Sequence, residues 1–134
     1  MDLIADTTFL IGIWRRQPWA VGYASQHRAA ALGIPWIVLG EFWHGSIRAG
    51  HDPTLVSEFL NIGQAILEVE PVIPVYARLC AAIQDSPAYR NIGQNDLWIA
   101  ATALVHGKPL VTRNARHFEA IPKLRLEVIG NASF

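Results

Sequence analysis

The chain of 134 residues is poor in cysteine and in charge. Cys80 is the only cysteine, so an internal disulfide is excluded and a zinc site built from cysteines is not expected. Charged residues make up 16% of the chain and the formal net charge is zero, which gives no global attraction to a polyanion. Hydrophobic residues make up 51%, an excess that leads us to expect a homodimer or a hydrophobic groove for a partner.

Segments that would direct the chain into a membrane are also missing. The first six residues lack the basic residues of a signal peptide, and the uncharged stretches are too short, or too broken by glycine and proline, to span a bilayer. No repeat, low-complexity tract or linker divides the chain. We therefore expect a cytoplasmic protein whose residues 1–134 form a single domain.

Short apolar runs alternate with helical patterns along the chain. The runs predict strands at Leu3–Ala5, Trp36–Leu39, Ile66–Val69, Leu110–Thr112 and Leu126–Ile129. Helices are predicted at Phe9–Arg16 with Thr7 and Thr8 as caps, at Pro18–Leu32 with Gly33 as its end, at Glu41–Ala49, from Asp52 onward, at Pro74–Gln84 and at Asp96–His106, with Asp85–Gln94 as a loop. Apolar strands that alternate with helices form parallel sheets covered on both faces. The sequence thus predicts an α/β fold, a three-layer α/β/α sandwich around a mostly parallel, twisted sheet of about five strands.

Three acidic residues stand at the edges of apolar runs. Asp6 follows the first predicted strand, Glu41 follows the second, and Asp96 opens an apolar helix. Ligands of open α/β sheets bind beyond the carboxyl ends of the strands, and Asn114, just after the fourth strand, would share a crevice with Asp6 if those strands are neighbours. Because carboxylates that are brought together repel one another, such a cluster indicates a divalent cation among them.

Four segments carry a resemblance to a known family. They are LIADTTFL at residues 3–10, LGEFWHG at 39–45, IGQNDLWIAA at 92–101 and LVTRNARHF at 110–118. In this order the chain resembles the PIN-domain nucleases, in particular the VapC-type toxins of bacterial toxin–antitoxin pairs. The resemblance implies a PIN-like α/β/α sandwich, an endoribonuclease that hydrolyses RNA phosphodiester bonds with Mg²⁺ or Mn²⁺, and a cognate antitoxin protein as partner.

The resemblance also implies roles for single residues. Asp6, Glu41 and Asp96 would hold the cation directly or through its waters, and either Glu41 or Asp96 would accept the proton of the attacking water. Asn114 would position that water, and it stands where many members of the family have an aspartate. Three carboxylates without a fourth favour one metal ion over two.

Further polar residues are expected to assist. Thr8 and Thr112 could orient the carboxylates or the waters, and Arg113 and Arg116 could bind RNA phosphates beside the scissile one. Each assignment has an ordinary alternative: an N-cap for Asp6, a turn residue for Asn114, and a solvated surface for the two arginines.

Other side chains near these segments receive structural interpretations. His44 and His117 are not expected to take part, because the acids already account for the chemistry. Trp14 and Trp19 are expected to pack in the core, with an antitoxin groove or RNA stacking as alternatives.

Two other functions remain open. A PIN fold with weak catalysis could be an RNA- or partner-binding module, a hypothesis favoured by Asn114. A phosphotransfer domain with Asp6 as acceptor is disfavoured, because no Asp-x-Asp pair follows the first strand and no lysine follows a strand where the phosphate would need one.

Overall fold

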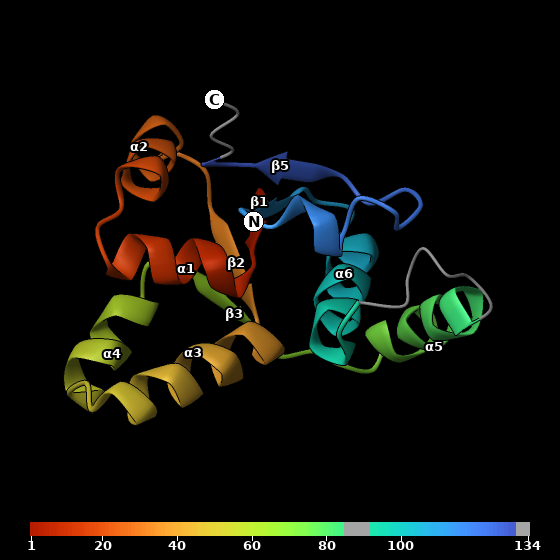
Figure 1. Ribbon diagram of the computed structural model, residues 1–134, viewed down its shortest axis with the longest axis horizontal. Coiled ribbons are helices and arrows are strands. Elements are labelled where there is room, and N and C mark those ends of the chain that lie inside the picture. The colour runs from red at the N-terminus through yellow and green to blue at the C-terminus, as the bar shows by residue number, and fades with distance from the viewer. Residues whose placement is uncertain (85–91, 131–134) are drawn as a thin grey trace.

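The computed structural model describes residues 1–84 and 92–130, in which a parallel five-stranded sheet is the central layer. Its strands are β1 (Leu3–Ala5), β2 (Leu32–Pro35), β3 (Gln64–Ile66), β4 (Leu110–Thr112) and β5 (Leu126–Val128). The helices are α1 (Thr7–Trp14), α2 (Pro18–Gln26), α3 (Trp36–Ala49), α4 (Pro53–Leu60), α5 (Val72–Gln84), α6 (Gln94–His106) and the short 3₁₀ turn η2 (Ala115–His117). Figure 1 shows the strands between α1 to α4 on the left and α5 with α6 on the right. The predicted α/β sandwich is confirmed.

The strand order, β3-β2-β1-β4-β5, places β1 at the centre of the sheet. It pairs with β2 on one side and with β4 on the other, and all pairs are parallel. The chain runs outward in both directions from β1, so the strand order reverses between β1 and β4. Because crevices form at such a reversal, beyond the carboxyl ends of the strands, the residues that follow β1 and β4 are placed at a natural binding site.

The second predicted strand was wrong. Residues 36–39 are the first turn of α3, and the strand is Leu32–Pro35. An apolar run of four residues fits a buried helix as well as a strand, and here Val38 and Phe42 form the buried face of the helix. Gly33, predicted to end a helix, lies within β2, where a Cβ atom would come within 2.1 Å of the Met1 sulfur. The glycine therefore reflects a close approach of side chains, and α2 ends earlier, at Gln26.

Smaller differences concern element ends. β3 ends at Ile66 rather than continuing to Val69, and the following Leu67 is 67% exposed. α1 begins at Thr7 with Asp6 as its N-cap, so the predicted threonine caps were wrong. Helix α5 begins at Val72, α6 begins at Gln94, and β5 ends at Val128. Most of the predicted loop, residues 85–91, lies outside the described residues.

Aromatic side chains fill the spaces between the helices. Trp14 meets the rings of Phe42 and Phe59 edge-on, and Trp98 stacks on Tyr76 with ring centroids 3.7 Å apart. The packing of Trp14 agrees with the core role predicted for it. Within the described ranges, no helix combines the length and the apolar character needed to cross a membrane.

Candidate active site

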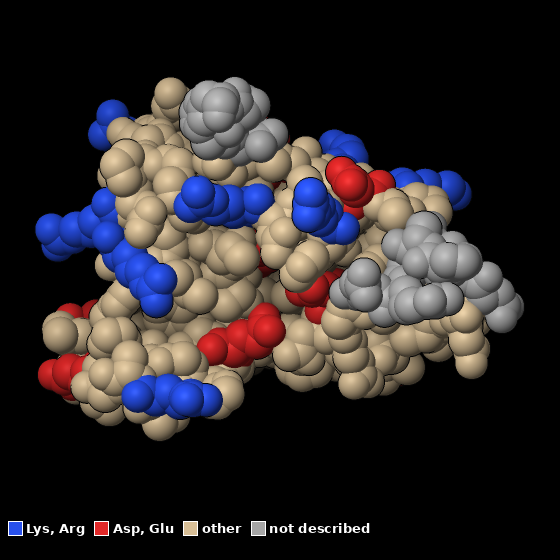
Figure 2. All heavy atoms as spheres, viewed as in Figure 1, with Lys and Arg blue, Asp and Glu red and all other residues tan. Residues whose placement is uncertain are grey.

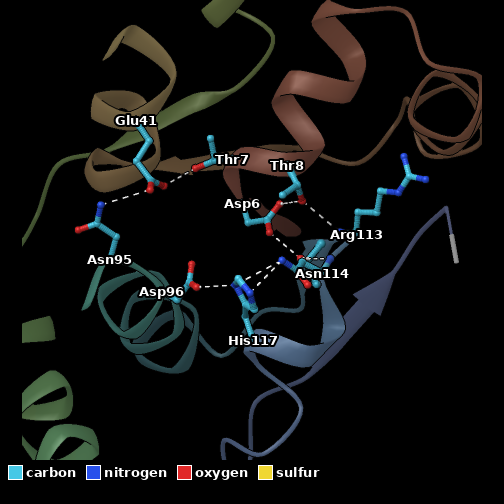
Figure 3. A network of polar contacts seen from close by, with 10 residues as sticks. Asp6, Thr7, Thr8, Glu41, Asn95, Asp96, Arg113, Asn114 and His117 are labelled. Atoms are coloured by element: carbon cyan, nitrogen blue, oxygen red, sulfur yellow. Dashed lines mark hydrogen bonds and ion pairs between the residues drawn. The ribbon is translucent and has the colours of Figure 1, made fainter. Parts of the chain in front are cut away.

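The four predicted catalytic residues meet in one pocket of about 220 Å³, which Thr8 also lines. Asp6 follows β1, Glu41 lies in the second turn of α3, Asp96 lies in the first turn of α6, and Asn114 follows β4. Figure 3 shows the three carboxylates directed toward a shared space. In Figure 2, acidic atoms gather around the central recess of the same face.

Asp6 is the most buried of the three acids, with 3% of its surface exposed. Its Oδ1 accepts hydrogen bonds from the Thr8 hydroxyl at 2.7 Å and from the Phe9 backbone N–H at 3.1 Å. Its Oδ2 accepts from the Thr112 hydroxyl at 2.5 Å. Burial raises the pKa of Asp6, the three hydrogen bonds oppose that rise, and the charge of Asp96 adds to it. One residue therefore caps α1 and also points a carboxylate into the pocket.

Asp96 is paired with a histidine that sequence reasoning set aside. The Nδ1 atom of His117 lies 2.7 Å from Asp96 Oδ2, and the Nδ2 atom of Asn114 lies 3.1 Å from His117 Nε2. Burial raises the pKa of Asp96; the His117 ring lowers it by charge and hydrogen bonding, and the charge of Glu41 raises it. In the sequence, the spacing of Asn114 and His117 could have indicated this pairing. Residues three apart in a 3₁₀ turn lie on the same side of it, so both side chains face the pocket.

Glu41 is held by two residues that the sequence did not single out. Its Oε1 accepts a hydrogen bond from the Thr7 hydroxyl at 2.5 Å, and its Oε2 accepts from the Asn95 side-chain amide at 3.2 Å. The predicted start of this helix at Glu41 was wrong: α3 begins at Trp36, so Glu41 lies in its second turn. Thr7 and Asn95 are adjacent to Asp6 and Asp96, so each neighbouring acid brings a partner for Glu41.

Oxygen donors of this kind suit a hard divalent cation. As placed, the residues of the two described ranges form no group of three His, Cys, Asp or Glu side chains that could hold a metal ion. Two of the carboxylates have other partners: Thr7 and Asn95 hydrogen-bond to Glu41, and His117 contacts Asp96. The chemistry of the donors fits a cation, and ligation by all three carboxylates requires them to come closer together than they lie here.

The two predicted RNA-binding arginines occupy different places. The Arg113 backbone N–H donates to the Thr8 hydroxyl at 3.1 Å, which links it to Asp6 through one side chain. Its guanidinium extends away from the acids in Figure 3 and lies 4.4 Å from the centre of the Trp19 ring. Arg116 is exposed on η2 and does not line the acidic pocket.

Comparison with solved structures supports the fold. A chain in the crystal structure of VapBC2 from Rickettsia felis, bound to a DNA fragment from their promoter, superposes with a TM-score of 0.82 and 24% identity, covering 96% of this chain and 99% of that chain. A chain in VapBC-1 from nontypeable Haemophilus influenzae gives 0.81 and 21%, covering 96% and 98%. The two TM-scores establish a shared architecture.

Sequence comparison gives relatives of similar length. The Ribonuclease VapC of Rickettsia bellii is 28% identical over 137 residues, which covers 94% of this chain and 95% of that protein. Ribonuclease VapC2 of Haemophilus influenzae is 27% identical over 130 residues, covering 95% and 97%. The family model of the PIN domain matches residues 3–124, which include every residue that lines the acidic pocket and every strand but β5. By this match over most of its length, the chain belongs to the PIN domain family.

Proposed function

We propose that the protein is a metal-dependent endoribonuclease and the toxin of a toxin–antitoxin pair. The observation that carries the proposal is the pocket at the strand-order reversal, where Asp6, Glu41 and Asp96 arrive from three different elements. Family membership and relatives named Ribonuclease VapC support it. The reaction is hydrolysis of an RNA phosphodiester bond.

A cation explains why acids are gathered here. Burial and neighbouring carboxylates raise the pKa values of Asp6 and Asp96, so the ionised forms are disfavoured in the free protein. Mg²⁺ or Mn²⁺ held by Asp6, Glu41 and Asp96 offsets that repulsion, because both ions prefer oxygen ligands. When bound, the ion supplies the polarisation of a phosphoryl oxygen and lowers the pKa of a water.

The hydrogen bonds indicate which side chains orient the carboxylates and which oxygen accepts a proton. Thr8 and Thr112 fix the orientation of the Asp6 carboxylate. Both oxygens of Glu41 accept hydrogen bonds, whereas Oδ1 of Asp96 accepts none from the residues in the described ranges. Asp96 Oδ1 is therefore the better placed oxygen to accept a proton from the attacking water, with His117 steadying the other oxygen.

Partner binding forms the second half of the proposal. Structural neighbours of this chain are VapBC assemblies, two of which are described as bound to DNA. Large apolar side chains are exposed on several elements: Val21, Ile47, Leu55, Ile62, Leu67 and Ile73. An antitoxin and a second copy of the chain are the partners proposed for such surfaces.

The test is cleavage of a mixed structured RNA by purified protein free of antitoxin, with Mg²⁺ or Mn²⁺, and with a chelator. Glu41→Gln removes one pocket charge, and Glu58→Gln, an exposed acid on α4, is the matched control. Cleavage that requires the metal, is lost in Glu41→Gln and persists in Glu58→Gln supports the proposal.

Calorimetric titration with Mn²⁺ separates the remaining outcomes. Metal binding without cleavage would favour the binding-module alternative, in which the fold is kept and catalysis is weak. Absence of metal binding would refute the metal-dependent reaction itself.

A further inference from the structure

A second pocket, of about 210 Å³, adjoins the acidic one. The side chains of Arg15, Gln17, Trp19 and Arg113 line it, together with Thr8 and the α1 surface behind it; we call it the arginine pocket. No aspartate or glutamate lines it. The acidic pocket therefore favours a cation and its neighbour favours an anion.

The arginine pocket is held in shape by tight packing. Trp19 lies directly on α1: a Cβ atom on Gly12 would come within 2.3 Å of the indole ring. The indole N–H of Trp19 donates to Gln17 Oε1 at 3.1 Å. The Arg113 guanidinium lies over the Trp19 ring, 4.4 Å from its centre. A cation stacked on a fixed aromatic surface loses little freedom when it binds an anion, and guanidinium groups suit phosphate.

The two pockets share a wall. Thr8 lines both of them, donating its hydroxyl proton to Asp6 and accepting the backbone N–H of Arg113. Arg113 is thus tied to the acidic pocket while its side chain leads away from it (Figure 3). A polyanion whose reacting phosphate lies among the acids would place an adjoining phosphate at the arginine pocket.

We propose that the arginine pocket binds an RNA phosphate next to the scissile one, with Arg15 and Arg113 as its ligands and Trp19 as the support of Arg113. The inference rests on the proposed ribonuclease function and adds a substrate subsite to it. Arg15 was not among the residues predicted to bind RNA, Trp19 was given RNA stacking only as an alternative to core packing, and Arg116 does not line this pocket.

The experiment combines protein variants with RNAs in which one phosphate at a time is replaced by a neutral methylphosphonate. Arg113→Gln and Arg15→Gln are compared with Arg48→Gln, an exposed arginine at the end of α3. For the wild type and Arg48→Gln, one replacement beside the cleaved bond is expected to raise KM about tenfold with little change in kcat. In Arg113→Gln and in Arg15→Gln the same replacement is expected to raise KM less than in the wild type, because each variant has already lost one of the two arginine ligands.

Salt dependence gives a second readout. Each lost phosphate contact is expected to lower the slope of log affinity against log salt by about 0.7. Equal methylphosphonate effects in wild type and both arginine variants, in a protein that cuts RNA, would overturn the subsite and leave the nuclease intact. An unaltered RNA affinity combined with weaker capture of an acidic antitoxin segment would also overturn it, and would assign the pocket to a protein partner.

A wild type that cuts no RNA would reject the proposed function separately. Anisotropy of a fluorescent single-stranded RNA, measured with chelator, would then test the pocket alone. Weaker binding by both arginine variants than by Arg48→Gln would support the phosphate site, and equal binding would refute it.

Discussion

Thr112→Val tests whether a buried hydroxyl keeps the Asp6 carboxylate ionised. Valine matches threonine in shape, so the change removes a hydroxyl from a fully buried position without opening a cavity. Two hydrogen bonds are lost: the donation to Asp6 Oδ2 at 2.5 Å and the acceptance from the Asn114 N–H at 2.9 Å. A hydrogen bond to a charged group contributes about 1.5–3 kcal/mol, and a neutral one contributes about 0.5–1.5 kcal/mol. The free energy of unfolding is therefore expected to fall by about 2–4 kcal/mol where Asp6 is ionised.

The loss should depend on pH. The Thr112 hydroxyl lowers the pKa of Asp6, so Thr112→Val moves that pKa further up, in the direction in which burial already raises it. A group whose pKa is raised in the folded state loses stability as the pH rises through that pKa. The variant should consequently lie closest to the wild type at acidic pH, and the difference should grow by about 1 kcal/mol toward mildly alkaline pH.

Urea unfolding of both proteins across this pH range is the assay, with the slope of the transition as a check on two-state behaviour. A double-mutant cycle with Asp6→Asn isolates the charge, and its coupling energy should be about 1 kcal/mol at alkaline pH. A stability loss that is constant with pH, or a coupling energy of zero, would refute the argument that Thr112 acts on the charge of Asp6.

Three further predictions concern the same region. Asp6→Asn should raise the urea midpoint at neutral pH, because burial raises the pKa of Asp6 above its ordinary 3.8 and ionisation thus weakens the folded state. The gain in the urea midpoint should shrink as the pH falls, and a gain that stays constant with pH would contradict the role of ionisation. His117→Gln should raise the pKa of Asp96 and so move the acidic limb of RNA cleavage to higher pH, and an unmoved limb in the pH–rate profile would remove His117 from the site. Gly12→Ala should lower the free energy of unfolding by about 1–3 kcal/mol through overlap with Trp19, and urea denaturation identical to that of the wild type would show that the ring can move aside.

The candidate site was predictable where a residue and its element are neighbours in sequence. Asp6 directly follows an apolar strand, and Asn114 stands two residues beyond the end of another, so a parallel sheet brings them to one edge whatever the exact strand ends. Even the mistaken strand at residues 36–39 left Glu41 on the correct side, because the true strand ends at Pro35 and α3 begins at once. Errors in element type at this point did not move the acid away from the crevice.

Contacts between side chains of distant segments could not be predicted from the sequence. Glu41 is held by Thr7 and Asn95, which are 34 and 54 residues away in sequence, and no local pattern marks those pairs. His117 was set aside because the acids accounted for the chemistry, yet the short turn after β4 brings its ring to Asp96. Such pairings depend on how helices are set against the sheet, which the periodicity of a single segment does not specify.

The sequence by itself determined the class of fold, the succession of helices and strands along the chain, and the positions of Asp6 and Asn114 just after strands, because apolar periodicity and the residues at strand ends are local properties of the chain. Only the tertiary structure decided that Gly33 stands in a strand, that His117 faces Asp96, and that Arg113 leaves the acidic pocket to lie over Trp19. The physical reason is that these outcomes depend on close packing between segments far apart in the chain, where a few tenths of an ångström decide which side chains meet.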